Sequence, residues 1–118
     1  MELIKEYRFE AAHRLPHVPP GHQCGRPHGH SYRVGIHVEG EVNEAAGWVI
    51  DYAEINAVVK PIIDELDHRT LEEIPGLENP TSENLARWLW QHIAPRILLL
   101  SAVTVHETAT SSCVYRGA

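Results

Sequence analysis

Apolar and polar residues alternate along the first forty residues of the chain in two separate runs. The first run covers residues 3–12, and its apolar side chains share one parity: Leu3, Tyr7, Phe9 and Ala11. The second run alternates more strictly, through Tyr32, Val34, Ile36 and Val38. Because successive side chains of a strand point to opposite faces, both runs predict half-buried strands. Further strands are predicted over residues 48–50, 102–108 and 112–116.

Two amphipathic helices are predicted between these strands. Asp51 can cap the first helix, and apolar residues then follow at helical spacing: Ile55, Val58, Val59, Ile62, Ile63 and Leu66. Pro61 lies inside this stripe and should kink the helix or remove one of its hydrogen bonds. The second helix begins at Thr81 or Ser82 and buries Leu85, Trp88, Leu89 and Ile93.

The order of the main elements is therefore ββααββ, with the strands separated from the helices along the chain. This separation is typical of an α+β fold rather than of a wound parallel sheet. We expect antiparallel strands with both helices on one face of the sheet. The 118 residues contain no repeat and no linker, so we expect a single domain over residues 1–118.

Charge and cysteine content narrow the class of protein. The formal net charge is −6, and the ten basic residues are scattered along the chain, so a nucleic-acid or anionic-membrane surface is not expected. Two cysteines make no disulfide framework. The first residues show no export signal, and the longest apolar stretch, near residues 97–103, is far too short to span a bilayer. We expect a soluble, cytoplasmic protein.

Three histidines carry the candidate chemistry. His28 and His30 form an H-x-H pair at the start of the second strand, so both imidazoles can point to one face. His13 ends the first strand and can supply a third nitrogen from the neighbouring chain segment. Three neutral imidazoles with a fourth position open are typical of catalytic zinc. Zinc is favoured over iron because no carboxylate completes a set of two histidines and one acid.

Cys24 lies four residues before His28, and two interpretations of it remain open. As a thiolate beside the metal, it would act as a base or nucleophile in an enzyme. As a fourth ligand, it would close the site and leave a structural zinc that serves stability alone.

Acidic residues elsewhere are candidates for proton transfer or binding. His68 follows Asp67 directly, and two interpretations are open. The two residues form an acid–base relay, or His68 is a cation that the dipole of the first helix stabilises at its C-terminal end. Glu107 follows an apolar run near a strand end, so it is either a buried, functional carboxylate or a solvated strand terminus.

These motifs together resemble the 6-pyruvoyl-tetrahydropterin synthase family. The resemblance runs from end to end and rests on FEAAHRL at 9–15, CGRPHGH at 24–30, LDH at 66–68, NPTSE at 79–83 and HET at 106–108. The short spacing between Cys24 and His28 resembles the bacterial branch that makes 6-carboxy-5,6,7,8-tetrahydropterin in queuosine biosynthesis. The implied architecture is a tunnelling fold (T-fold): a four-stranded antiparallel sheet with two helices on one face, which assembles into oligomeric barrels. The implied assembly is a homohexamer of two stacked trimers, with active sites at subunit interfaces.

The resemblance also implies roles for particular residues. The ligands of Zn²⁺ correspond to His13, His28 and His30. The catalytic thiol corresponds to Cys24, the acid–base relay to Asp67 and His68, and the carboxylate that anchors the pterin ring to Glu107. The implied substrate is 7,8-dihydroneopterin triphosphate, and the implied products are 6-carboxy-5,6,7,8-tetrahydropterin, acetaldehyde and triphosphate. For the triphosphate we expect Arg14 and Arg26, which flank the metal ligands in sequence, with Lys5 and Arg8 as alternatives.

Overall fold

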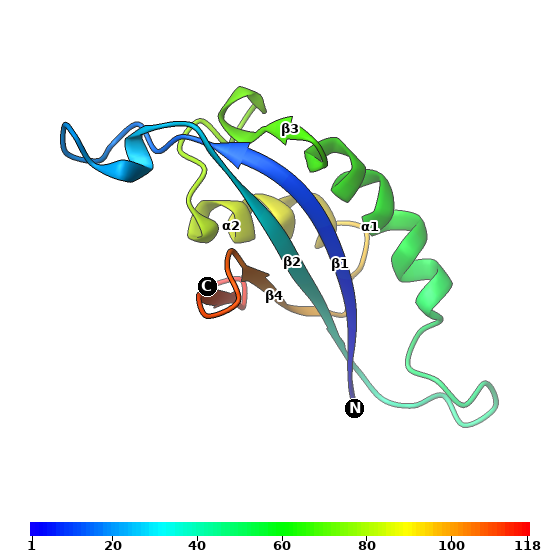
Figure 1. Cartoon of the computed structure of the whole chain (residues 1–118). Coiled ribbons are helices and arrows are strands. Elements are labelled where there is room, and N and C mark those ends of the chain that lie inside the picture. Colours follow the sequence, from blue (N-terminus) through cyan, green and yellow to red (C-terminus); the bar gives the residue numbers. More distant parts are fainter.

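The computed structural model describes residues 1–118 as five strands, two α-helices and two short 3₁₀ turns (Figure 1). The strands are β1 (Glu2–His13), β2 (His28–Glu39), β3 (Arg69–Thr70), β4 (Leu100–His106) and β5 (Ser112–Tyr115). The helices are α1 (Tyr52–Leu66) and α2 (Ser82–Ile93), and the 3₁₀ turns cover Gln23–Gly25 and Leu71–Glu73. No helix is both long and apolar enough to cross a membrane.

All strands belong to one sheet with the order β3-β1-β2-β4-β5. The four longer strands pair antiparallel, as predicted. The strand count of four was wrong, because β3 adds a two-residue strand that pairs parallel to β1 at Ala11 and Ala12. A two-residue strand is too short to show any periodicity, so the sequence pattern could not reveal it.

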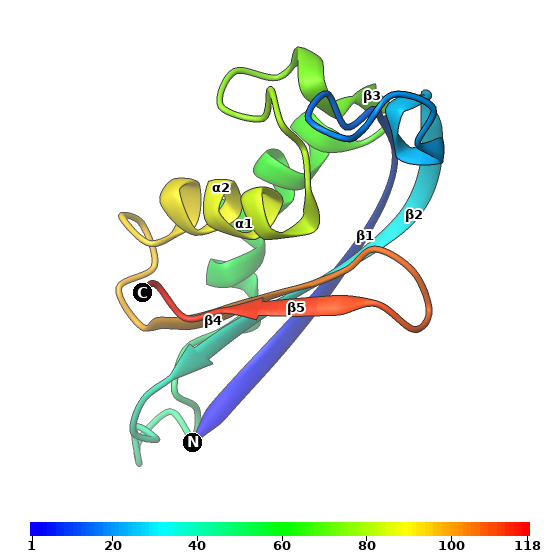
Figure 2. The ribbon, with the colours of Figure 1, turned by 90° about the vertical axis from the view of Figure 1, so that its left-hand side faces the viewer.

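Both helices cover one face of the sheet, and the other face carries no helix (Figure 2). Helix α1 contacts β1, whereas α2 contacts β4 and β5. A core of 24 buried residues fills the space between the two layers, including the predicted stripe residues Ile55, Val59 and Leu66. The α+β class and the one-sided helix layer are confirmed.

Two local predictions had different outcomes. Residues 48–50 were predicted as a strand, which was wrong: the structure has only an isolated bridge between Asn43 and Trp48. Helix α1 continues through Pro61, whose ring is on the exposed face of the helix. Pro61 has no backbone N–H to donate to the carbonyl of Ala57, one helical turn earlier. Ala57 is exposed, so water can bind this carbonyl instead.

The hairpin of β1 and β2 places the candidate site. Its register pairs Phe9 with Tyr32 and ends with His13 opposite His28. Residues 14–27, which connect the two strands, project beyond this end of the sheet as a separate lobe (Figure 1). The start of α2 reaches the same end, because the carbonyl of Pro80 lies 2.9 Å from Nδ1 of His13.

Candidate metal centre and active site

Three imidazoles converge at the end of the hairpin. Nε2 of His13 lies 2.9 Å from Nε2 of His28 and 3.1 Å from Nε2 of His30. The cross-strand pairing of His13 with His28 and the two-residue spacing to His30 produce this convergence. The three side chains form the group of potential ligands in the chain whose donor atoms all lie within 4.8 Å of one another.

Backbone carbonyls orient two of these rings. Nδ1 of His13 bonds the carbonyl of Pro80 at 2.9 Å, and Nδ1 of His28 bonds the carbonyl of Arg26 at 2.7 Å. A carbonyl can only accept, so each Nδ1 carries the proton and each Nε2 presents a lone pair toward the shared centre. Such outer partners are typical of histidines that bind metals, and the donor set therefore fits a metal ion.

The surroundings of His30 favour its neutral form, and one carboxylate lies beside the three histidines. Burial lowers the pKa of His30, although the negative charge of Glu107 opposes this effect. His13 is 1% exposed, and its Nε2 lies 4.0 Å from Oε1 of Glu107. Glu107 follows β4 at the turn into β5, where its N–H donates to the carbonyl of Ser111. Glu107 is thus partly buried beside the histidine cluster, and it is not only a solvated strand end.

Cys24 lies in the 3₁₀ turn of the projecting lobe and is partly buried. Its backbone is fixed, since its N–H donates to Nδ1 of His22 and its carbonyl accepts from the N–H of Leu15. The thiol is not a member of the three-histidine group. The group of potential metal ligands thus consists of the three histidines without Cys24.

Asp67 and His68 form a hydrogen-bonded pair at the end of α1. Oδ1 of Asp67 lies 3.0 Å from Nδ1 of His68 and also accepts the backbone N–H of Glu10 at 2.9 Å. These contacts lower the pKa of the Asp67 carboxyl, the bond from Glu10 having the larger effect and the bond from His68 a smaller one. His68 has a φ of 58°, a left-handed conformation that ends the helix and returns the chain along β1.

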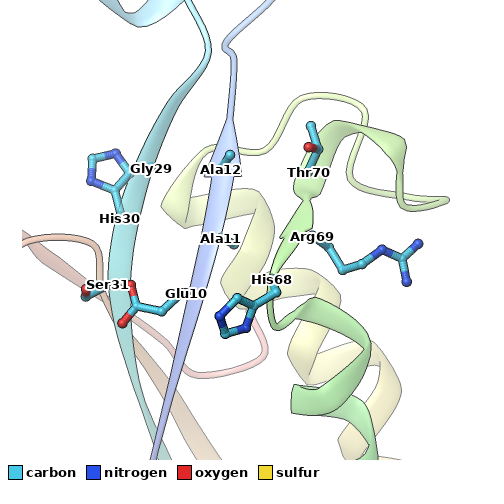
Figure 3. Close-up of a pocket in the computed structure, with 9 residues that line it drawn as sticks. All are labelled: Glu10, Ala11, Ala12, Gly29, His30, Ser31, His68, Arg69 and Thr70. Atoms are coloured by element: carbon cyan, nitrogen blue, oxygen red, sulfur yellow. Dashed lines mark hydrogen bonds between the residues drawn. The ribbon is translucent and has the colours of Figure 1, made fainter.

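His68 borders an open cleft of about 390 Å³ that His30 also lines. Figure 3 shows the imidazole of His68 turned toward β1 and Glu10, whereas the guanidinium of Arg69 points away from the strands. The side chain of His68 is 78% exposed, and no hydrogen bond or ion pair joins it to the histidine cluster.

Arg14 and Arg26 lie together in the projecting lobe, where both line a cavity of about 380 Å³. Neither of the two arginines makes an ion pair, and the backbone N–H of Arg14 donates to Oε1 of Glu72. The lobe thus carries Cys24 and both predicted phosphate-binding arginines on one segment.

The sequence patterns missed two contributors to the site. The hydroxyl of Tyr32 lies 3.1 Å from Nδ1 of His13, and the carbonyl of Pro80 contacts the same nitrogen. Tyr32 shares its strand parity with His28 and His30, which was a usable signal. A backbone carbonyl has no such signal, because any residue supplies one.

Comparison with known proteins identifies the group to which this site belongs. The sequence matches the model of the 6-pyruvoyl tetrahydropterin synthase family over residues 2–118. The chain belongs to the 6-pyruvoyl tetrahydropterin synthase family. The resemblance predicted from the motifs is therefore confirmed, and the chain is placed among pterin-processing enzymes.

Several members of the family are similar to this chain over most of their length. The 6-carboxy-5,6,7,8-tetrahydropterin synthase of Synechocystis sp. is 37% identical over 119 residues, covering 96% of this chain and 91% of that protein. The dihydroneopterin monophosphate aldolase of Pyrococcus furiosus is 35% identical over 91 residues, covering 77% of this chain and 73% of that protein. The structure of Caenorhabditis elegans 6-pyruvoyl tetrahydropterin synthase superposes with a TM-score of 0.92 at 26% identity, covering 100% of this chain and 96% of that chain.

Proposed function

We propose that this chain is a zinc-dependent lyase that converts 7,8-dihydroneopterin triphosphate and water to 6-carboxy-5,6,7,8-tetrahydropterin, acetaldehyde and triphosphate, an early step of queuosine biosynthesis. The observation that carries the proposal is the three-histidine group with converging Nε2 atoms in a chain 37% identical to a 6-carboxy-5,6,7,8-tetrahydropterin synthase. The proposal takes residues 1–118 as a single catalytic domain and the protein as cytoplasmic.

Zn²⁺ would be held by His13, His28 and His30, whose donor atoms fit it. When bound, zinc would supply Lewis-acid chemistry at the hydroxyl groups of the substrate side chain. The fixed Nδ1–H bonds of His13 and His28 keep the ligand nitrogens deprotonated and in place without a reorganisation of the rings.

Each remaining candidate residue has a distinct role in the proposed reaction. Cys24 as a thiolate removes a proton from the substrate side chain, and His68 moves protons at the other side of it. Asp67 accepts the Nδ1 hydrogen of His68, which leaves Nε2 of His68 as the exchanging atom. Glu107 accepts hydrogen bonds from the amino and ring N–H groups of the pterin and so orients the ring. Arg14 and Arg26 bind the triphosphate.

A complete site would require more than one copy of the chain. The side chain of His68 is 78% exposed and has no bond to the histidine cluster, as expected if it serves the site of a neighbouring subunit. This supports the homohexamer of two trimers that the family resemblance implies.

The test is incubation of the zinc-loaded protein with 7,8-dihydroneopterin triphosphate, with mass analysis of the pterin and an assay for acetaldehyde. The proposal predicts the carboxy product with one acetaldehyde per turnover. A pyruvoyl product without acetaldehyde would instead identify a 6-pyruvoyl-tetrahydropterin synthase. Parallel incubations with sepiapterin and dihydroneopterin monophosphate test side-chain cleavage of related pterins. Tight zinc binding without turnover of any of these substrates would identify a non-catalytic zinc-binding module.

A further inference from the structure

A row of two arginines and one histidine crosses three adjacent strands. The strand register pairs Arg8 of β1 with Arg33 of β2, and Arg33 in turn with His106 of β4. Residues directly opposite each other in antiparallel strands point to the same face. Their sequence neighbours Tyr32 and Val105 are buried toward the helices, so the row lies on the face that carries no helix (Figure 2).

The charges in this row have no carboxylate partner. The ion pairs of the chain involve other residues, and neither Arg8 nor Arg33 has a carboxylate oxygen within 4.0 Å. The only side-chain bond in the row is from Nη2 of Arg33 to Nδ1 of His106, at 3.3 Å. With Nδ1 accepting from the guanidinium, the ring hydrogen of His106 is on Nε2, which can act as a donor.

Such a row is unfavourable by itself. Like charges directly opposite each other on neighbouring strands repel and destabilise the sheet. Glu6 and Glu10 flank Arg8 on the same face of β1, but neither makes an ion pair with it. One oxygen of Glu10 accepts the hydroxyl of Ser31 at 2.6 Å. An external anion would remove the repulsion between the two arginines.

The row also lines a space that can hold such an anion. A cavity of about 540 Å³ is lined by Arg8, Arg33 and His106, together with the hydroxyl-bearing Ser31 and Thr108 and the carboxylate of Glu10. This volume lies in the usual range of small-molecule sites. Guanidinium groups bind phosphate oxygens through two parallel hydrogen bonds, which makes oligophosphate the matching anion chemistry.

We propose that Arg8, Arg33 and His106 form an oligophosphate-binding site on the helix-free face of the sheet, separate from the three-histidine group. This proposal stands on register and charge and does not depend on the proposed reaction. Two sources share the chemistry: the triphosphate tail of a substrate bound at a subunit interface, in which case this row takes the role proposed above for Arg14 and Arg26, or a free oligophosphate.

Calorimetric titration of the zinc-loaded protein with inorganic tripolyphosphate tests the site directly. Arg33→Gln and Arg8→Gln should each weaken binding by about 10-fold or more, since each removes a charge-assisted hydrogen-bond donor. Arg96→Gln, which removes the same charge from an exposed position after α2, should bind as the wild type does. Tripolyphosphate can also chelate zinc, so a variant without the metal is needed as a second control. His28→Ala, which should lose its zinc, should still bind tripolyphosphate.

Kinetic measurements on the same variants distinguish the two sources. A raised KM for 7,8-dihydroneopterin triphosphate in Arg33→Gln would identify the substrate tail as the occupant, whereas an unchanged KM together with lost tripolyphosphate binding would identify a free anion. Either result supports the site. The proposal is overturned if Arg8→Gln and Arg33→Gln bind tripolyphosphate like Arg96→Gln, or if binding is lost in His28→Ala and kept in Arg33→Gln.

Discussion

At the scale of single residues, the carboxylate of Asp67 links the end of α1 to the edge of the sheet. Its pKa is lowered chiefly by the N–H of Glu10, so the ionised form stabilises the fold. A carboxyl with a lowered folded-state pKa contributes stability above its unfolded pKa, about 3.9, and loses that contribution as the pH falls through the folded value. Urea unfolding should therefore show Asp67→Asn clearly less stable than the wild type at pH 6, with a smaller difference at pH 3. Glu44→Gln, at an exposed turn position, is the control. An equal difference at both pH values would contradict the role of the Asp67 charge.

Glu107 provides a second prediction at this scale. If its carboxylate accepts N–H groups of the pterin ring, Glu107→Gln should keep its fold and its zinc but use the substrate less well. The lost acceptor and the mispaired donor should raise the activation free energy that corresponds to kcat/KM by about 1–3 kcal/mol. Steady-state kinetics with metal analysis of the same sample measures both properties. Unchanged kcat and KM would show that the 4.0 Å approach of Glu107 to His13 has no part in substrate binding.

The residue patterns anticipated some of these contacts and not others. The H-x-H spacing and the hairpin register were enough to predict that His13, His28 and His30 meet. The bond between Asp67 and His68 was only one of two open interpretations of the sequence, because neighbouring side chains seldom face each other. It forms because His68 adopts a φ of 58°, and nothing in the local sequence required that conformation of a histidine.

At the scale of elements, the first turn of α2 connects helix stability to the metal centre. The hydroxyl of Thr81 accepts the N–H of Asn84 at 3.2 Å as the helix cap, and the preceding carbonyl, of Pro80, holds His13. Thr81→Ala should lower the free energy of unfolding by about 1 kcal/mol. It should also weaken zinc binding, measured by competition with a chelator. Thr110→Ala, at an exposed turn position, should change neither property; a destabilised Thr81→Ala with unaltered zinc affinity would show that the cap does not support the site.

The elements themselves were predictable where they are long and periodic. The alternation of β2 and the apolar stripe of α1 each extend over enough residues to define a face. Residues 48–50 are apolar but too few to establish a period, and tertiary contacts leave Trp48 in an isolated bridge. Strand β3 forms only because the left-handed His68 directs the chain back along β1, which is a tertiary event.

At the scale of the whole molecule, both edges of the sheet can pair further. Strand β1 pairs with β3 only at Ala11 and Ala12, so most of its outer edge is open, and β5 has no neighbour on its other side. Open edges favour pairing with another chain. We predict a homo-oligomer, a hexamer by family resemblance, and sedimentation at micromolar concentration measures it. A fully active monomer under these conditions would contradict both the edge pairing and the shared active sites.

The central claim is that the three histidines hold zinc in an open site beside which Cys24 acts in catalysis. Metal analysis and turnover of Cys24→Ala after gel filtration test it most directly, with His28→Ala as the comparison. An open site predicts that Cys24→Ala stays folded and retains its zinc, while turnover of 7,8-dihydroneopterin triphosphate falls by roughly 10²-fold or more, whereas His28→Ala loses metal and activity together. A zinc-depleted and destabilised Cys24→Ala protein would contradict the claim, since it would make Cys24 the fourth ligand of a closed site.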